Sequence, residues 1–210
     1  MTPIFPDARI LVFCKAPVPG QVKTRMISTL TPVEAADLHI DLTQKTLELV
    51  CRTALCPIEL WCSPSIDHPF FDRCAENFEI TLRAQQGNNL GERMHHAFCS
   101  ALSSAEHALL IGCDCASFMQ HDIFNALSAL RDNHDVVLAP AQDGGYVLIG
   151  LNQPQPEIFD GINWGTNNVL ETTRNRISEL RLDCFELPEQ WDVDIPEDLE
   201  KYRLFSQNLF

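Results

Sequence analysis

The chain has 210 residues, of which 45% are hydrophobic and 21% charged, a composition typical of a folded protein with one sizeable core. Its formal net charge of −14 disfavours nucleic acids and anionic membranes as main partners, because either would require a basic surface, so neither is an expected partner. Nine cysteines without a C-x-x-C pair indicate reduced thiols and not a disulfide framework or a zinc ribbon. Because the sequence shows no basic apolar leader and no long uncharged apolar run, we expect a cytoplasmic protein with a single domain over residues 1–210.

Apolar, β-rich runs alternate with helical patterns along the chain, which predicts a layered α/β fold with a mostly parallel sheet. Strands are predicted at residues 9–14, 58–62, 79–83, 108–112, 135–140, 146–151 and 184–187. The clearest helices are predicted at residues 32–52, 89–103, 122–132, 167–180 and 196–207. The first of these helices begins after Thr31-Pro32-Val33-Glu34, a capping box with proline at the first helical position.

One connection between strands predicts a reversed strand direction. Only residues 141–145 separate the strands at 135–140 and 146–151. A parallel crossover needs about a dozen residues or more, so this loop is too short for one. We therefore expect a mixed sheet in which one late strand runs antiparallel to its neighbours.

The loop at residues 15–25 follows the first predicted strand, at the edge where open α/β sheets bind ligands. Its prolines stiffen the backbone, Gly20 permits close approach or a positive φ, and Lys23 and Arg25 offer charge-assisted donors to phosphate oxygens. Residues 8–33 contain no Asp or Glu, so the loop is a local positive region. The pattern favours a phosphate-binding loop over an exposed loop with solvated cations. It is neither a Walker loop nor a dinucleotide fingerprint.

Asp114 follows the apolar run Ala108-Leu-Leu-Ile-Gly-Cys113 and is a candidate metal ligand at the same edge of the sheet. A carboxylate there can hold Mg²⁺ or Mn²⁺, because these hard cations prefer oxygen ligands and commonly bridge to phosphates. Alternatively, Asp114 caps the segment that follows. Cys113 and Cys115 flank it and point away from it in an extended segment, which argues against a soft-metal site containing all three.

The segment Trp191-Asp-Val-Asp194-Ile-Pro-Glu-Asp198 precedes the last predicted helix. If it is extended, Asp192 and Asp194 share a face, and either could complete a metal shell begun by Asp114. The alternative is helix capping by Asp194, with the acidic residues after it favouring the positive end of the helix. Both roles stay open, since one carboxylate can cap while another binds metal.

Two further segments offer polar groups to a ligand. In the turn Gln142-Asp143-Gly144-Gly145-Tyr146, the glycines leave room for a ligand while Asp143 and Tyr146 provide polar contacts; ordinary hairpin chemistry is the alternative. The amide-rich loop that begins at Gln85 could contact a nucleobase or ribose, although a turn and an N-cap would explain it without function.

Together these segments resemble the bacterial DUF2064 proteins, described as GT-A superfamily members and candidate nucleotide-diphospho-sugar transferases, and sometimes labelled arsenosugar-biosynthesis glycosyltransferases. The family is also similar to molybdenum cofactor guanylyltransferase and related nucleotidyltransferases. The resemblance implies a single-domain three-layer α/β/α GT-A fold, mostly parallel with one antiparallel strand. The matching runs, between residues 15 and 199, are K-A-P-V-P-G-Q-V-K-T-R-M, Q-G-N-N-L-G-E-R-M, L-L-I-G-C-D-C, A-P-A-Q-D-G-G-Y-V-L-I-G-L and D-V-D-I-P-E-D-L.

The resemblance also implies roles for individual residues. Asp114 and Asp194 would hold Mg²⁺ or Mn²⁺, and Lys23, Arg25 and Asp114 would be the catalytic residues. The nucleotide would contact Lys15, Ala16, Pro17, Gly20, Lys23, Thr24, Arg25 and Gln85. The acceptor would contact Asp143, Gly144, Gly145 and Tyr146. The family usually has proline two residues after the central aspartate, where this chain has Ala116, and we expect this change to loosen the metal loop.

Three functions are compatible with these features. The first is metal-dependent transfer from an activated nucleotide to a small-molecule acceptor, by a nucleotide-sugar glycosyltransferase or by a nucleotidyltransferase acting on a nucleoside triphosphate. The second is a non-catalytic nucleotide-binding protein, which would bind its ligand without metal dependence. The third, motivated only by the nine cysteines, is a binding protein for a soft metal or an arsenical.

Overall fold

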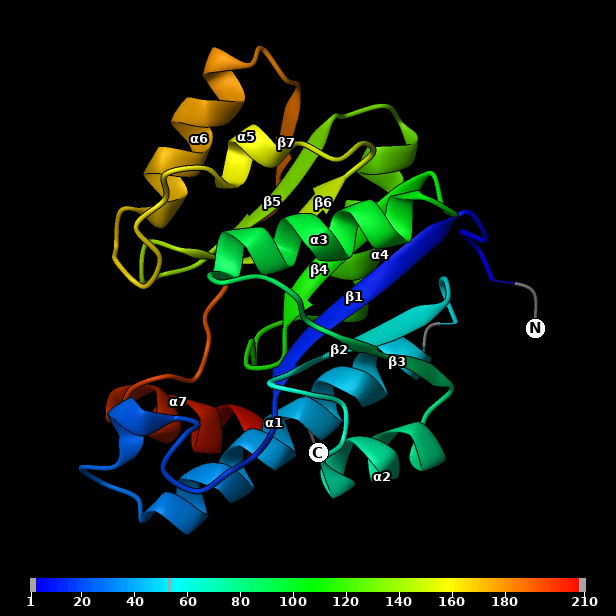
Figure 1. Cartoon of the computed structure of the whole chain (residues 1–210). Coiled ribbons are helices and arrows are strands. Elements are labelled where there is room, and N and C mark those ends of the chain that lie inside the picture. The colour runs from blue at the N-terminus through cyan, green and yellow to red at the C-terminus, as the bar shows by residue number, and fades with distance from the viewer. Residues whose placement is uncertain (1–2, 53, 208–210) are drawn as a thin grey trace.

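The computed structural model of the chain describes residues 3–52 and 54–207 (Figure 1). Within these residues one sheet forms, with the strand order β3-β2-β1-β4-β6-β5-β7. Its strands are β1 (Ala8–Lys15), β2 (Ile58–Ser63), β3 (Ile80–Ala84), β4 (His107–Gly112), β5 (Val136–Pro140), β6 (Tyr146–Leu151) and β7 (Cys184–Glu186). Its helices are α1 (Pro32–Arg52), α2 (Pro69–Asn77), α3 (Leu90–Leu102), α4 (Gln120–Arg131), α5 (Pro156–Phe159), α6 (Val169–Glu179) and α7 (Pro196–Gln207), with a 3₁₀ turn, η1 (Thr24–Met26).

Alternation along the central strand β1 builds a core on each face of the sheet. Ile10 and Val12 pack with apolar residues of α1, α2 and α4. Leu11 and Phe13, on the opposite face, pack with residues of α3, α5 and α6. Figure 1 shows α3 crossing one face of the sheet, opposite α4. The predicted three-layer α/β/α architecture is therefore confirmed.

Strand β6 is the reversed strand that the short loop predicts. It pairs antiparallel with β4, where Ala108 lies opposite Leu151, and antiparallel with β5 on its other side. The pairs β1–β2, β1–β4, β2–β3 and β5–β7 are parallel. Because β4 pairs in parallel with β1, the carboxyl ends of these two strands meet at one edge of the sheet.

Each strand and helix that the sequence predicts is present, with ends that agree to within two residues. The capping box forms as expected: the Glu34 N–H donates to Thr31 Oγ1 at 3.3 Å, and the Thr31 N–H donates to Glu34 Oε2 at 2.8 Å. Helix α2, which the sequence analysis did not single out, is capped by His68 and buries Phe70. Among residues 3–52 and 54–207, no helix has both the length and the apolarity to cross a membrane.

A small third core, which we call the minor core, joins the loop after β1 to the last described helix. It contains Met26, Leu42, Val193, Leu199 and Tyr202. Met26 directly follows Arg25 in the chain, and Val193 directly precedes Asp194. Packing in the minor core therefore fixes the backbone next to both of these charged residues, which lie far apart in sequence.

Candidate active site

A cleft of about 530 Å³ opens at the carboxyl ends of β1 and β4. Its walls include Lys15 at the end of β1, Gly112 at the end of β4, and the loop of residues 21–25. Ligands of open α/β sheets bind outside the carboxyl ends of the strands, so the position of the cleft is that of a ligand site. It also gathers charged side chains from both ends of the sequence.

The conformation of the loop after β1 directs the Lys23 side chain toward the interior of the protein. Gly20 has a φ of +80°, and Lys23 itself has a left-handed φ of 48° just before η1. A left-handed conformation costs a residue with a Cβ about 1–2 kcal/mol, so surrounding contacts must hold it. One such contact is the Met26 N–H, which donates to the Lys23 carbonyl at 2.9 Å. The lysine side chain is then only 4% exposed.

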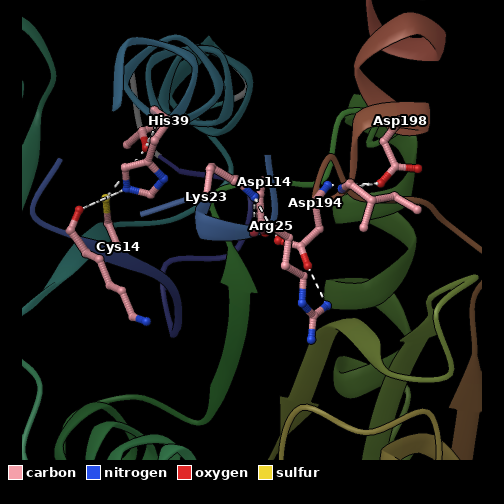
Figure 2. Close-up of polar contacts among 10 residues, drawn as sticks. Cys14, Lys23, Arg25, His39, Asp114, Asp194 and Asp198 are labelled. Atoms are coloured by element: carbon pink, nitrogen blue, oxygen red, sulfur yellow. Dashed lines mark hydrogen bonds and ion pairs between the residues drawn. The ribbon is translucent and has the colours of Figure 1, made fainter. Parts of the chain in front are cut away.

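Two cations and two carboxylates form a continuous chain of ion pairs in the cleft (Figure 2). Lys23 Nζ lies 2.9 Å from Asp114 Oδ2 and 3.9 Å from Asp194 Oδ1. Arg25 Nη1 lies 2.7 Å from Asp194 Oδ2. The structure thus joins the candidate phosphate loop to both candidate metal ligands.

The ion pair between Lys23 and Asp114 shifts the pKa values of both groups. Burial alone disfavours the charged form of Lys23, but the charge of Asp114 and its hydrogen bond outweigh burial and raise the lysine pKa. Burial likewise acts to raise the pKa of Asp114, and Lys23 outweighs it, so that this pKa is lowered. Both groups are therefore held in their charged forms.

Backbone contacts hold the acidic segment against the residues that follow β4. The Val193 N–H donates to the Asp114 carbonyl at 3.0 Å, and Cys115 and Asp192 form an antiparallel bridge. Beyond them, the carboxylate of Asp198 accepts hydrogen bonds from the N–H groups of Asp194 and Ile195 at 3.0 and 2.9 Å. Asp198, the third residue of α7, therefore holds the backbone just before the helix, while the Asp194 carboxylate pairs with Arg25.

Ser117 supports the loop after Asp114. Its hydroxyl donates to Gln190 Oε1 at 2.8 Å and accepts the Trp191 N–H at 3.0 Å. The side chains of Cys113 and Cys115 are buried while that of Asp114 is partly exposed, as expected for alternation in an extended segment. Hydrogen bonds from Ser117 thus tie this loop to the acidic segment.

The oxygen donors of the cleft suit a hard divalent cation in kind, while no three of the described Asp and Glu side chains bring their ligand atoms within 4.8 Å of one another. Four carboxylates line it, those of Asp114, Asp143, Asp192 and Asp194. Burial, together with the charges of Asp114 and Asp143, raises the pKa of Asp192 to about 6. Neighbouring negative charge thus adds to the effect of burial, and Lys23 lies between Asp114 and Asp194, where it balances part of that charge. Oxygen ligands of this kind suit Mg²⁺ and Mn²⁺.

Gly112 makes room for the central carboxylate. A Cβ at this position would lie 2.8 Å from Asp114 Oδ1. The carboxylate would have to move to relieve such a contact, so the glycine at the end of β4 permits the observed position of Asp114.

Most of the candidate nucleotide-binding residues line the cleft. Lys15, Lys23, Thr24, Arg25 and Gln85 do so, whereas Ala16, Pro17 and Gly20 are not part of its wall. The buried Ala16 donates its N–H to the Ser63 carbonyl at 2.7 Å, so its role is to fix the start of the loop. The side-chain amide of Gln85 donates to the Trp61 carbonyl at 2.8 Å.

Arg93 is a cleft residue that the sequence analysis did not single out. It lies on α3, and its Nε donates to the Gly87 carbonyl at 3.1 Å. Asn89 caps α3, since its side chain accepts the Glu92 N–H. Given that cap, Arg93 falls on the first turn of the helix, close to the amide-rich loop. Recognising Asn89 as the N-cap would have predicted from the sequence that Arg93 lies in the first turn of this helix.

A smaller pocket of about 210 Å³ adjoins the cleft and includes the candidate acceptor turn. Asp143, Gly145 and Tyr146 line it, and Asp143 lines the cleft as well. Gly144 is not in its wall but has a φ of +87°, and a Cβ there would lie 2.1 Å from the Asn167 carbonyl oxygen. The turn thus packs closely against the backbone before α6. Burial raises the pKa of Tyr146.

The chain has a GT-A-like nucleotide-diphospho-sugar transferase fold, with three α/β/α layers and a mostly parallel sheet. A cationic loop follows the first strand, and a carboxylate follows the strand beside it. A crystal structure from Desulfovibrio desulfuricans G20, described as a candidate nucleotide-diphospho-sugar transferase, is 31% identical to this chain. The alignment covers 91% of this chain and 84% of that one, with a TM-score of 0.82. Residues 46–166 match the DUF2064 profile, described as an uncharacterized protein conserved in bacteria. The chain belongs to the DUF2064 family.

More distant solved structures share the fold alone. The 4-diphosphocytidyl-2C-methyl-D-erythritol synthase of Anaerococcus prevotii DSM 20548 is 8% identical over 96% of this chain and 99% of that one, with a TM-score of 0.65. Glucosyl-3-phosphoglycerate synthase of Mycobacterium tuberculosis, solved with Mn²⁺, UDP and glucosyl-3-phosphoglycerate, is 10% identical over 94% and 76%, with a TM-score of 0.52. No curated protein matches the sequence.

Proposed function

We propose that this chain is a divalent-metal-dependent transferase that uses an activated nucleotide donor, and that the donor is a nucleotide sugar. The observation that carries the proposal is the chain of ion pairs Lys23–Asp114 and Arg25–Asp194 at the carboxyl edge of the sheet. It joins two cations suited to phosphate with two carboxylates suited to Mg²⁺ or Mn²⁺. The 31% identical relative, a candidate nucleotide-diphospho-sugar transferase, supports the same class.

Asp114 and Asp194 would hold the cation, which would supply positive charge to the donor's pyrophosphate. Lys23 and Arg25 would then exchange their carboxylate partners for phosphate oxygens. Because the same carboxylates hold the lysine and arginine when no cation is bound, metal binding and nucleotide binding should strengthen each other. In the reaction, Lys23 and Arg25 would stabilise the charge that develops on the departing nucleoside diphosphate.

The small pocket beside the cleft would hold the acceptor. Asp143 lines both cavities, so its carboxylate can reach an acceptor group that faces the donor. We assign it to orient the acceptor hydroxyl and to take its proton as the bond from the sugar to the phosphate oxygen breaks. The products would be a glycosylated acceptor and a nucleoside diphosphate.

Thermal unfolding with nucleotides and metals tests this proposal. A ligand at 100 times its Kd adds about 2.7 kcal/mol to the unfolding free energy, or roughly 5–10 °C in Tm for a chain of this size. We expect a nucleotide sugar to raise Tm in the presence of Mg²⁺ or Mn²⁺ and to have little effect in EDTA. Nucleotide binding that is indifferent to metal, with no release of nucleoside diphosphate on incubation with acceptors, would instead establish a non-catalytic binding protein.

Nucleotidyl transfer is the second candidate, and the position of the cationic loop favours it. Lys23 and Arg25 lie in the loop that follows β1, where they could hold the β- and γ-phosphates of a nucleoside triphosphate. Folds of this kind include cytidylyltransferases such as the inositol-1-phosphate CTP transferase of T. maritima, 12% identical with a TM-score of 0.60. Release of pyrophosphate from a triphosphate would identify this reaction, whereas release of nucleoside diphosphate from a nucleotide sugar would identify glycosyl transfer.

A further inference from the structure

A second group of possible metal ligands lies beside the carboxylates, and it has different chemistry. Cys14, His39 and Cys113 each present one ligand atom, and these atoms lie within 4.8 Å of one another. Across residues 3–52 and 54–207, this is the one such group of three or more Cys, His, Asp or Glu residues. We call it the thiol–imidazole cluster.

Sheet pairing explains why the two thiols meet. Strands β1 and β4 are adjacent and parallel, with Phe13 opposite Gly112. Cys14 and Cys113 are the next residues along the two segments, and both side chains belong to the core on one face of the sheet. His39 approaches that face from α1, and its Nε2 lies 3.6 Å from Cys14 Sγ (Figure 2).

The distances suit a small thiophilic ion. Two ligands of tetrahedral Zn²⁺, with bonds of about 2.0–2.3 Å, lie about 3.5 Å apart. The separation of 3.6 Å between Cys14 Sγ and His39 Nε2 already has this value. His39 Nε2 also lies 2.9 Å from the Lys15 carbonyl oxygen, and coordination through Nε2 would replace this contact with a bond to the ion.

The cluster is reachable from outside although its members are buried. Cys14, His39 and Cys113 are 2%, 5% and 5% exposed, yet all three line the cleft. Buried cysteines ordinarily act as small apolar side chains, and packing alone would explain Cys56 or Cys74 in this way. In contrast, the cluster turns two sulfur atoms and an imidazole toward one another at a cavity wall, which gives an ion both ligands and a path of entry.

We propose that Cys14, His39 and Cys113 bind a thiophilic d¹⁰ cation, for which Zn²⁺ is the probe, with a fourth coordination position open to the cleft. Two thiolates would balance the charge of Zn²⁺, so the bound ion would leave the net charge beside Lys23 almost unchanged. Carboxylates are absent from the three ligands, so Mg²⁺ should not compete for the cluster. Because Cys14 precedes Lys15 and Cys113 precedes Asp114, the ion would fix both strand ends that carry the cleft's charged groups.

Titration of the reduced protein with Co²⁺, followed by Zn²⁺, tests the proposal by absorption spectroscopy. We expect one equivalent of Co²⁺ to give thiolate charge-transfer and tetrahedral d–d bands, and Zn²⁺ to abolish them. An excess of Mg²⁺ should leave the bands intact. Binding of Zn²⁺ should also raise Tm, by roughly 5–10 °C at 100 times its Kd. Absence of thiolate bands at stoichiometric Co²⁺ would overturn the proposal.

Variants separate the cluster from the other cysteines. Cys14→Ser and Cys113→Ser should each lose the thiolate bands or weaken Co²⁺ binding by at least about 10-fold, since each removes one of three protein ligands. Cys115→Ser, which changes a buried cysteine beside Asp114, and Cys99→Ser, which changes an exposed one near His95, should retain the bands. Retention of the wild-type spectrum by Cys14→Ser would show that the metal binds elsewhere and would refute the assignment.

Where a cluster variant unfolds, His39→Gln provides the second test. Glutamine keeps a hydrogen-bonding side chain near the Lys15 carbonyl but removes the imidazole ligand. We expect a folded protein with weakened Co²⁺ binding and with altered d–d bands. An unchanged spectrum in this variant would exclude His39 and would contradict the three-ligand site.

Discussion

Replacing Lys23 by methionine tests whether its ammonium group balances the carboxylates of the cleft. The substitution keeps an apolar stem and removes a charge that lies 2.9 Å from Asp114 and 3.9 Å from Asp194. At an effective dielectric constant of about 20, attraction over the shorter distance is about 6 kcal/mol. Desolvation of the ammonium offsets several kcal/mol, and the carboxylate side chains are 35% and 33% exposed, so water screens part of the rest. We expect the metal-free variant to lose about 1–3 kcal/mol of unfolding free energy, or roughly 2–10 °C in Tm.

Mn²⁺ should reverse this loss, because carboxylates that have lost Lys23 attract a divalent cation more strongly. Thermal unfolding in EDTA and in Mn²⁺ measures both effects, and turnover of the donor should fall by about 100-fold or more. Lys45→Met is the matched control, since Lys45 pairs with Asp41 outside the cleft at 3.1 Å. The reasoning is refuted if Mn²⁺ stabilises Lys23→Met no more than the wild type, or if the variant keeps normal turnover.

Three further predictions address the supports of the cleft. Gly112→Ala should weaken Mn²⁺ binding by roughly 10- to 100-fold, because its Cβ would lie 2.8 Å from Asp114 Oδ1; unchanged affinity by calorimetry would contradict this role. Ser117→Ala should cost about 1–2 kcal/mol and speed hydrogen exchange at the Val193 amide, whereas wild-type exchange would mean that Ser117 does not hold the segment. The pKa of Asp192 is raised from 3.8 to about 6, so the folded protein binds more protons than the unfolded chain between these values, and its stability should fall as the pH rises through this range. Asp192→Asn should flatten that fall in metal-free denaturant titrations, and a parallel pH profile in both proteins would exclude Asp192 as its source.

Sequence patterns predicted most of the fold because local rules decide it. The capping box at Thr31 and Glu34 fixed the start of α1, and the short loop at 141–145 fixed the direction of β6. Helix α2 was not singled out. It is only a short helix, and its cap is His68, a residue outside the usual N-cap set.

The site was predicted in its parts but not in its contacts. The cationic loop and Asp114 were both identifiable, since each follows an apolar strand at the ligand edge of the sheet. Lys23 is buried against Asp114 because β1 and β4 are neighbours in the sheet. Neither segment of the sequence predicts this order of the strands. The proximity of Cys14 to Cys113 also depends on β1 and β4 being neighbours, so the number and spacing of the cysteines could not predict it.

The hydrogen bonds that Asp198 accepts bear on the position of the Asp194 carboxylate in the cleft. Asp198 accepts the N–H groups of Asp194 and Ile195, and this leaves the Asp194 carboxylate to Arg25. Without Asp198, these two N–H groups would lose their acceptor, and the turn that presents Asp194 to Arg25 would be held less firmly. The position of the Asp194 carboxylate in the cleft therefore depends on a residue that does not line the cleft.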